Sequence, residues 1–133
     1  MNIMIVSQYF WPENFRINDI TRELLERGHS VTVLTGIPNY PAGKVFEDYK
    51  QDKDAFACYE GAEVVRVPML VRGKGHVRLF LNYLSFVIGG CLYGPWRLRG
   101  KKADVIFVFG LSPVTLALPA ILLGRIKRVP VVM

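Results

Sequence analysis

Two apolar runs and one amphipathic segment fill the first 35 residues, and this pattern limits the folds open to the chain. Residues 3–6 form a short apolar run typical of a buried strand, and SVTVLT at residues 30–35 is rich in β-branched residues. Between them, apolar residues recur at helical spacing over residues 17–25, and Gly28 follows as the expected helix end. A strand, a helix and a second strand this close together predict a βαβ unit with parallel strands.

The remainder of the chain continues the alternation of strands and helices. Two short strands are predicted on either side of the Glu60–Gly61 pair, the second over residues 63–67. A third apolar run, ADVIFVFG at residues 103–110, predicts a further strand, and residues 115–127 predict a mostly apolar helix. Residues 36–56 are rich in Gly, Pro and Asn and are expected to form a long loop. The predicted fold is α/β: a Rossmann-like parallel sheet with helices on both faces.

Length and charge bound the possible functions. A chain of 133 residues suits one domain, and RVPVVM at its end is expected to be a strand at which this domain is cut short. The net charge of +6 leaves open nucleic acid, an anionic membrane, phosphate-bearing substrates or a merely solvated basic surface. The only cysteines, Cys58 and Cys91, have no metal-ligand spacing and imply no disulfide framework, so a cytoplasmic location is expected.

Polar and aromatic residues follow three of the predicted strands. QYFWPEN occupies residues 8–14, GIPNYPAGK residues 36–44 and FGLSP residues 109–113. Because parallel strands end at the same edge of a sheet, these loops are expected to converge on a ligand. Neither G-x-G-x-x-G nor a Walker loop is present, which argues against a nucleotide-dependent dehydrogenase or epimerase. Such a site would use side chains and the amino end of a helix, with Asn14 as a candidate cap.

QYFWPENFRIND and RGHSVTVLTGIPNYPAGK resemble the opening of GT-B glycosyltransferases of the large retaining family four. More narrowly, they are similar to colanic-acid and O-antigen enzymes described as fucosamine transferases. The resemblance covers nearly the whole chain, and NYPAGK is its most specific segment. It implies two Rossmann-like domains with the active site between them. Residues 1–133 would be the N-terminal, acceptor-side domain, without the donor-binding C-terminal domain.

The resemblance also implies an activity and its partners. The full protein would transfer a sugar, such as an L-fucosamine-like one, from a nucleotide-sugar to a lipid-linked saccharide in bacterial surface polysaccharide synthesis. Anomeric configuration would be retained, with no metal or cofactor at the chemical step and no nucleic acid partner. A domain that binds an acceptor or a partner enzyme without catalysis remains the alternative from another functional class.

The sequence departs from the family pattern at two places, so the catalytic residues stay unassigned. The stretch FRIN stands where many members carry a Gly-Gly pair, and Phe109 or Gly110 stands where many carry a histidine. The candidate substrate-binding residues are therefore Glu13, Asn14, Arg16, Asn39, Tyr40, Lys44, Gly110 and Ser112. Each also has a structural reading: an exposed pair for Glu13 and Arg16, and turn-forming roles for the others.

Residues 79–96 form the longest uncharged stretch, which would reach ~27 Å as a helix, close to a bilayer span. The pairs Gly89–Gly90 and Gly94–Pro95 are expected to interrupt it, so a membrane span is not expected. Basic residues flank the stretch on both sides. Two interpretations remain open: a helix lying on the anionic surface of the inner membrane, and a buried core helix with solvated ends.

Overall fold

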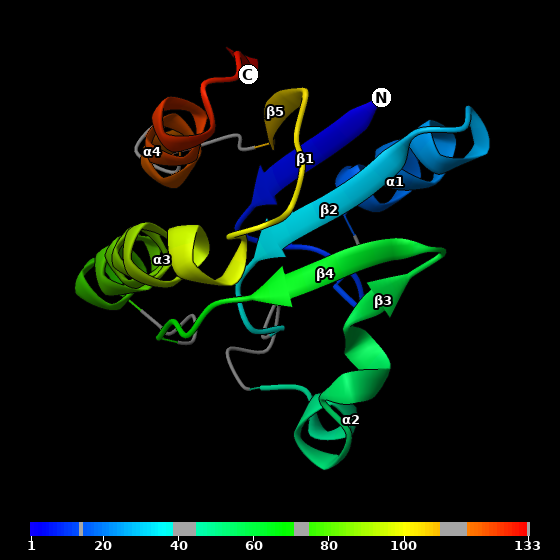
Figure 1. The fold of residues 1–133 in the computed structure, drawn as a ribbon. Helices are drawn as coiled ribbons and strands as arrows, with labels where there is room; N and C mark the ends of the chain where they lie inside the picture. Colours follow the sequence, from blue (N-terminus) through cyan, green and yellow to red (C-terminus); the bar gives the residue numbers. More distant parts are fainter. Residues whose placement is uncertain (14, 39–44, 71–74, 110–116, 133) are drawn as a thin grey trace.

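The computed structural model describes residues 1–13, 15–38, 45–70, 75–109 and 117–132. Figure 1 shows a twisted sheet with helices on both of its faces. The strands are β1 (Asn2–Ser7), β2 (Ser30–Thr35), β3 (Cys58–Tyr59), β4 (Ala62–Arg66), β5 (Val105–Phe109) and β6 (Val131–Val132). The helices are α1 (Arg16–Glu26), α2 (Glu47–Gln51), α3 (His76–Arg97) and α4 (Leu118–Lys127), with a 3-10 turn η1 (Asp54–Phe56).

The sheet has the strand order β3-β4-β2-β1-β5-β6, and its neighbouring strands are parallel except for β3 with β4. The predicted parallel sheet with helices on both faces is confirmed. The initial βαβ unit is confirmed in detail, since β2 begins and ends where SVTVLT does. Gly28 follows α1 with a φ of +89°, a left-handed conformation that favours glycine at a helix end.

Alternation along β1 divides the core into two layers. Ile3 and Ile5 point to the face covered by α1, whereas Met4 and Val6 point to the face covered by α3 and α4. Because successive side chains of a strand point to opposite faces, an apolar run of this kind needs a helix on each side. In Figure 1 the helix α1 lies on one side of the sheet, and α3 and α4 lie together on the other.

The glycine pairs do not interrupt α3, which contradicts the expectation from sequence. The helix is continuous from His76 to Arg97, with Pro95 in its last turn. A Cβ on Gly89 would lie 2.4 Å from the carbonyl oxygen of Pro68, and a Cβ on Gly90 would lie 2.7 Å from the Pro119 ring. These glycines therefore permit close packing of α3 on its neighbours, and the packing outweighs their low helix propensity.

The loop after β2 differs from the prediction, and the predicted start of the last helix lies outside the described residues. The connection after β2 is not a loop throughout, because α2 and η1 form within its second half. Tyr49 of α2 is buried and its ring packs near Phe56 of η1, so these short elements are held by aromatic contacts. The described part of the last helix begins at Leu118, inside the predicted range.

Candidate functional site at the carboxyl edge of the sheet

The turn after β1 uses its bulky residues for packing. Phe10 is fully buried and meets the ring of Tyr59 edge-on, with centroids 5.3 Å apart. The ring of Trp11 lies 5.0 Å from that of Phe56, and the ring of Tyr9 stacks on Phe15 at 5.1 Å. Aromatic packing therefore fixes this turn in place of the glycines common in nucleotide-binding folds.

Glu13 faces the interior of the turn. Its side chain is 1% exposed, and its Oε1 accepts a hydrogen bond from the backbone N–H of Phe10 at 3.3 Å. Its backbone carbonyl accepts a hydrogen bond from Asn18 Nδ2 at 2.7 Å. The Glu13 carboxylate is therefore not exposed on the described surface, and its role in substrate binding stays a prediction. Burial of a charge needs compensation, and the cation of Arg66, described below, interacts favourably with this carboxylate.

Arg16 begins α1 and is exposed. The helix is N-capped by Phe15 without a side-chain hydrogen bond, so the cap position falls one residue after the predicted one. Within the described part of the chain, Arg16 forms no ion pair with Glu13; it lines an open groove of about 630 Å³ along α1 that reaches His29. The structural reading of Glu13 and Arg16 as an exposed pair is wrong, because Glu13 is buried while Arg16 lies exposed on α1.

The first two of the predicted loops meet, as the parallel sheet requires. Thr35 Oγ1 donates a hydrogen bond to the carbonyl oxygen of Gln8 at 3.2 Å, and the Gly36 N–H donates to the same oxygen at 3.3 Å. The predicted convergence is confirmed for these two loops at their bases. Six of the candidate residues lie outside the described residues, and their roles stay predictions: Asn14, Asn39, Tyr40, Lys44, Gly110 and Ser112.

Arg66, at the carboxyl end of β4, forms hydrogen bonds to the loops that follow β1 and β2. It is 7% exposed, its Nη1 donates to the carbonyl of Gly36 at 3.0 Å, and its Nη2 donates to the carbonyl of Trp11. Burial lowers the pKa of Arg66 to about 10, while the nearby Tyr49 and Glu13 side chains act in the opposite direction. The guanidinium is therefore still a cation at neutral pH. Sequence reasoning missed this residue, although a lone arginine within the run VVRVP was a usable signal.

Asn82 joins α3 to the same turn. Its Oδ1 accepts hydrogen bonds from Gln8 Nε2 at 2.8 Å and from the Tyr9 hydroxyl at 3.2 Å. Its Nδ2 donates to the carbonyl of Leu70 at 2.7 Å, and the side chain is fully buried. Buried amides of this kind need partners and thereby fix the packing of the elements that supply them. The sequence showed Asn82 only as a polar interruption of an apolar run.

The described residues contain no group of three or more His, Cys, Asp or Glu side chains that could hold a metal ion. What they contain at the carboxyl edge is a rigid platform. Aromatic packing, the Arg66 cation and the Asn82 amide hold the turn after β1 against β2, β4 and α3. Open α/β sheets bind their ligands at the carboxyl ends of the strands. At this edge, backbone groups and the exposed Arg16 are available to a ligand.

The profile of the family described as "Glycosyl transferase 4-like domain" matches residues 14–133. No curated protein matches the sequence. The match therefore spans all the helices and five of the six strands of the fold.

Solved structures with the same fold include two glycosyltransferases. The glycotransferase of kitacinnamycin is 19% identical with a TM-score of 0.63, and the alignment covers 98% of this chain and 29% of that one. MurG of Acinetobacter baumannii is 19% identical with a TM-score of 0.54, covering 98% of this chain and 34% of that one. The C-terminal domain of the PF1911 hydrogenase from Pyrococcus furiosus is 15% identical with a TM-score of 0.55, covering 98% and 88%. Identities this low show the fold alone, and the predicted fold class, a Rossmann-like half of the GT-B type, is confirmed.

Proposed function

Because the chain belongs to the family of glycosyl transferase 4-like domains, we propose that it is the N-terminal, acceptor-side domain of a two-domain glycosyltransferase. The family match over residues 14–133 carries the proposal. The chain spans 29% and 34% of the length of the two glycosyltransferases whose fold it shares. The remaining part of such an enzyme would supply the domain that binds the nucleotide-sugar donor.

The proposed reaction takes a sugar, such as an L-fucosamine-like one, from its nucleotide to a saccharide acceptor linked to a lipid. The setting is bacterial surface polysaccharide synthesis at the cytoplasmic side of the inner membrane. Two observations support a ligand that is part polar and part lipid. The carboxyl edge of the sheet offers the exposed Arg16 and backbone groups, and the neighbouring helix α3 presents an apolar face to the outside.

A transfer assay on the full-length protein tests the proposed activity. The protein is incubated with a panel of sugar nucleotides and a polyprenyl-diphosphate-linked saccharide, and the acceptor mass is followed by mass spectrometry. We expect one donor to add the mass of one sugar residue to the acceptor. Tight acceptor binding with no mass change for any donor would instead favour the non-catalytic binding domain.

The outer face of α3 carries an apolar row, and this row supports attachment to a membrane. The α3 row consists of Phe80, Leu84, Ile88, Leu92 and Trp96, which recur every fourth residue and are 39–68% exposed. By length and composition, α3 is the one helix among the described residues that could cross a membrane. Of its apolar 18-residue stretch, 28% is buried inside the domain. A core helix of a globular domain would hide much more of this surface. The exposure of this row supports the first of the two interpretations, a helix lying on a membrane surface.

The other face of α3 packs on the sheet, which favours a helix lying on the membrane over one spanning it. Phe86 and Asn82 are fully buried, and Gly94 approaches Leu34 of β2.

The distribution of charge along the chain supports the same arrangement. Residues 64–133 contain eleven of the 17 basic residues and one of the 11 acidic residues, Asp104. An apolar helix face within a strongly basic half of the molecule suits the surface of an anionic bilayer.

We predict salt-sensitive binding of the full-length protein to vesicles that contain phosphatidylglycerol. Each cation near an anionic surface adds ~1 kcal/mol, so Arg78→Glu with Lys102→Glu should reduce recovery in a flotation assay severalfold at low salt. Arg22→Glu with Arg27→Glu on α1 is the matched control, because it changes the charge equally on the opposite face of the sheet. Equal recovery with neutral and anionic vesicles would reject the membrane surface.

A further inference from the structure

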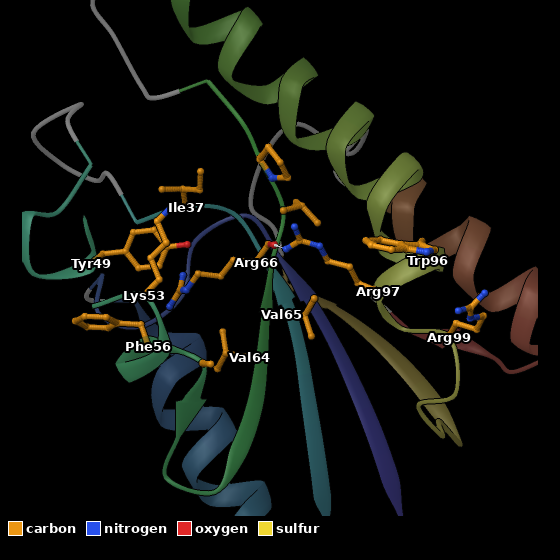
Figure 2. A pocket seen from close by; sticks show the side chains of 13 residues that line it. Ile37, Tyr49, Lys53, Phe56, Val64, Val65, Arg66, Trp96, Arg97 and Arg99 are labelled. Carbon is orange, nitrogen blue, oxygen red and sulfur yellow. Dashed lines mark hydrogen bonds between the residues drawn. The ribbon is translucent and has the colours of Figure 1, made fainter. Parts of the chain in front are cut away.

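A second concave region adjoins the carboxyl-edge site, along the outer edge of β4 and at its carboxyl end. β3 pairs with β4 only through Cys58 and Tyr59, so no strand covers the rest of this edge among the described residues. A pocket of about 640 Å³ occupies the gap between β4, the α2–η1 segment and the last turn of α3. Figure 2 shows Arg97 extending across it from α3 toward the backbone of Arg66, with Tyr49 and Phe56 on the opposite side.

The pocket is cationic without a matching acid. Its described lining includes Lys53, Arg66, Arg97 and Arg99, and none of its described lining residues is an Asp or a Glu. The charge of Lys53 is partly offset by its sequence neighbours Asp52 and Asp54. Arg97 and Arg99 have no such offset, because no acidic residue occurs between Glu63 and Asp104. A gathering of cations this close together is unfavourable unless an anion or solvent compensates it.

The three arginines keep donors available for an anion. Arg97 Nη1 donates a hydrogen bond to the carbonyl of Arg66, and the Arg97 guanidinium lies 5.6 Å from the centroid of the Tyr93 ring. The other N–H groups of Arg97 form no hydrogen bond with the described residues. No side-chain partner of Arg99 occurs among the described residues, and this residue is exposed. Arg66 also lines the pocket, and its Nε is buried without a hydrogen-bond partner. Guanidinium groups bind phosphate oxygens in pairs, which makes them suited to a phosphate.

The pocket is continuous with the α3 row. Trp96 ends that row, is 63% exposed and also lines the pocket beside Arg97. Tyr49, Phe56 and the strand valines give the pocket floor an apolar character. A ligand with a phosphate at one end and a hydrocarbon chain at the other therefore meets complementary surfaces at both ends.

We propose that this pocket binds the phosphate group of an anionic amphiphile, with Arg97 and Arg99 as direct partners and the hydrocarbon chain on the α3 row. The pocket adjoins the proposed acceptor site, because Ile37, Val67 and Pro68, which follow β2 and β4, line it. Arg66 links the two, since the same side chain holds the carbonyls of Trp11 and Gly36 in the carboxyl-edge loops. A lipid bound here would therefore contact Arg66, which positions the loops of the transferase site.

Calorimetric titration of the full-length protein with water-soluble probes tests this site without any need for transferase activity. The probes are dihexanoyl phosphatidate, inorganic phosphate and dihexanoyl phosphatidylcholine, all at one fixed ionic strength. We expect phosphatidate to bind at least tenfold tighter than either of the others. Loss of one charge-assisted hydrogen bond weakens binding about tenfold or more, so Arg99→Gln and Arg97→Gln should each raise the phosphatidate Kd by that factor. Arg27→Gln, which removes one exposed arginine from α1, should leave it unchanged.

Three results would overturn the proposal. Phosphatidate affinity equal in wild type, Arg99→Gln and Arg97→Gln would show that these arginines bind no phosphate. Inorganic phosphate binding as tightly as phosphatidate would leave no role for the hydrocarbon chain. Phosphatidylcholine binding as tightly would mean that the α3 row alone captures the chain. Because Arg97 also contacts the Arg66 backbone, its variant counts only if its melting temperature matches that of wild type, whereas Arg99 has no such contact.

Discussion

Replacing Arg66 by methionine is expected to destabilise this domain by about 3–5 kcal/mol, because the change removes one partner from a buried charged network. Arg66 is 7% exposed and holds the carbonyls of Gly36 and Trp11. Its cation also compensates the buried carboxylate of Glu13. Methionine fills a similar volume but removes the donor to both carbonyls and the cation that attracts the carboxylate.

Hydrogen exchange in the full-length protein measures this effect within the domain. We expect faster exchange of the β1, β2 and β4 amides in Arg66→Met, since these strands supply the residues that lose their partner. Arg22→Met is the matched control, because Arg22 Nη2 donates to the Tyr59 hydroxyl at 3.0 Å from an exposed helix face. An exposed arginine of this kind should leave strand exchange unchanged. Equal exchange in both variants would show that Arg66 does not hold the loops together.

Asn82→Leu is expected to have the second largest effect, on the order of 3 kcal/mol, because several buried polar groups lose their partner at once. Leucine is close to asparagine in shape, so the change removes hydrogen bonds without opening a large cavity. Gln8 Nε2, the Tyr9 hydroxyl and the carbonyl of Leu70 would each be left with one bond fewer.

The readout for Asn82→Leu is hydrogen exchange of residues 8–13, which we expect to rise because the turn after β1 loses its tie to α3. Ser85→Ala is the matched control on the same helix. The Ser85 Oγ accepts a hydrogen bond from the Leu70 N–H at 2.8 Å, so it contacts the same segment but not the turn. Unchanged exchange of residues 8–13 in Asn82→Leu would contradict the role given to this amide.

Periodicity and turn chemistry predicted the elements whose formation depends on local sequence. The alternation in SVTVLT and the helical spacing from Ile17 to Leu25 each specify one burial pattern, and β2 and α1 follow them closely. The glycines of α3 misled the prediction because their cost is set by what they pack against. Gly89 meets the backbone of Pro68 and Gly90 meets Pro119, contacts that no local window contains.

The same limit applies to the candidate site. Its convergence at the carboxyl edge followed from parallel strands, but the direction of the Glu13 side chain did not follow from sequence. Arg66 bonds to a carbonyl 55 positions away and Gln8 to an amide 74 positions away. Such pairs exist only once the sheet brings β4 and α3 beside the turn after β1. Residues that shape the site through such long-range contacts therefore could not be found from sequence, whereas the position of the turn itself could.

Turnover by Arg16→Lys in the full-length protein tests most directly whether a transferase acts at the carboxyl edge of this sheet. Lysine keeps the charge but cannot bind two phosphate oxygens at once, as the planar guanidinium does. Arg27→Lys is the matched control at the other end of α1, where Arg27 pairs with Glu23 at 2.9 Å. If Arg16 meets a phosphate of the donor or acceptor, kcat/KM should fall roughly ten- to a hundredfold in Arg16→Lys, the loss of one charge-assisted contact, with no change in melting temperature. Wild-type kcat and KM in Arg16→Lys and Arg16→Ala would contradict the placement of the site.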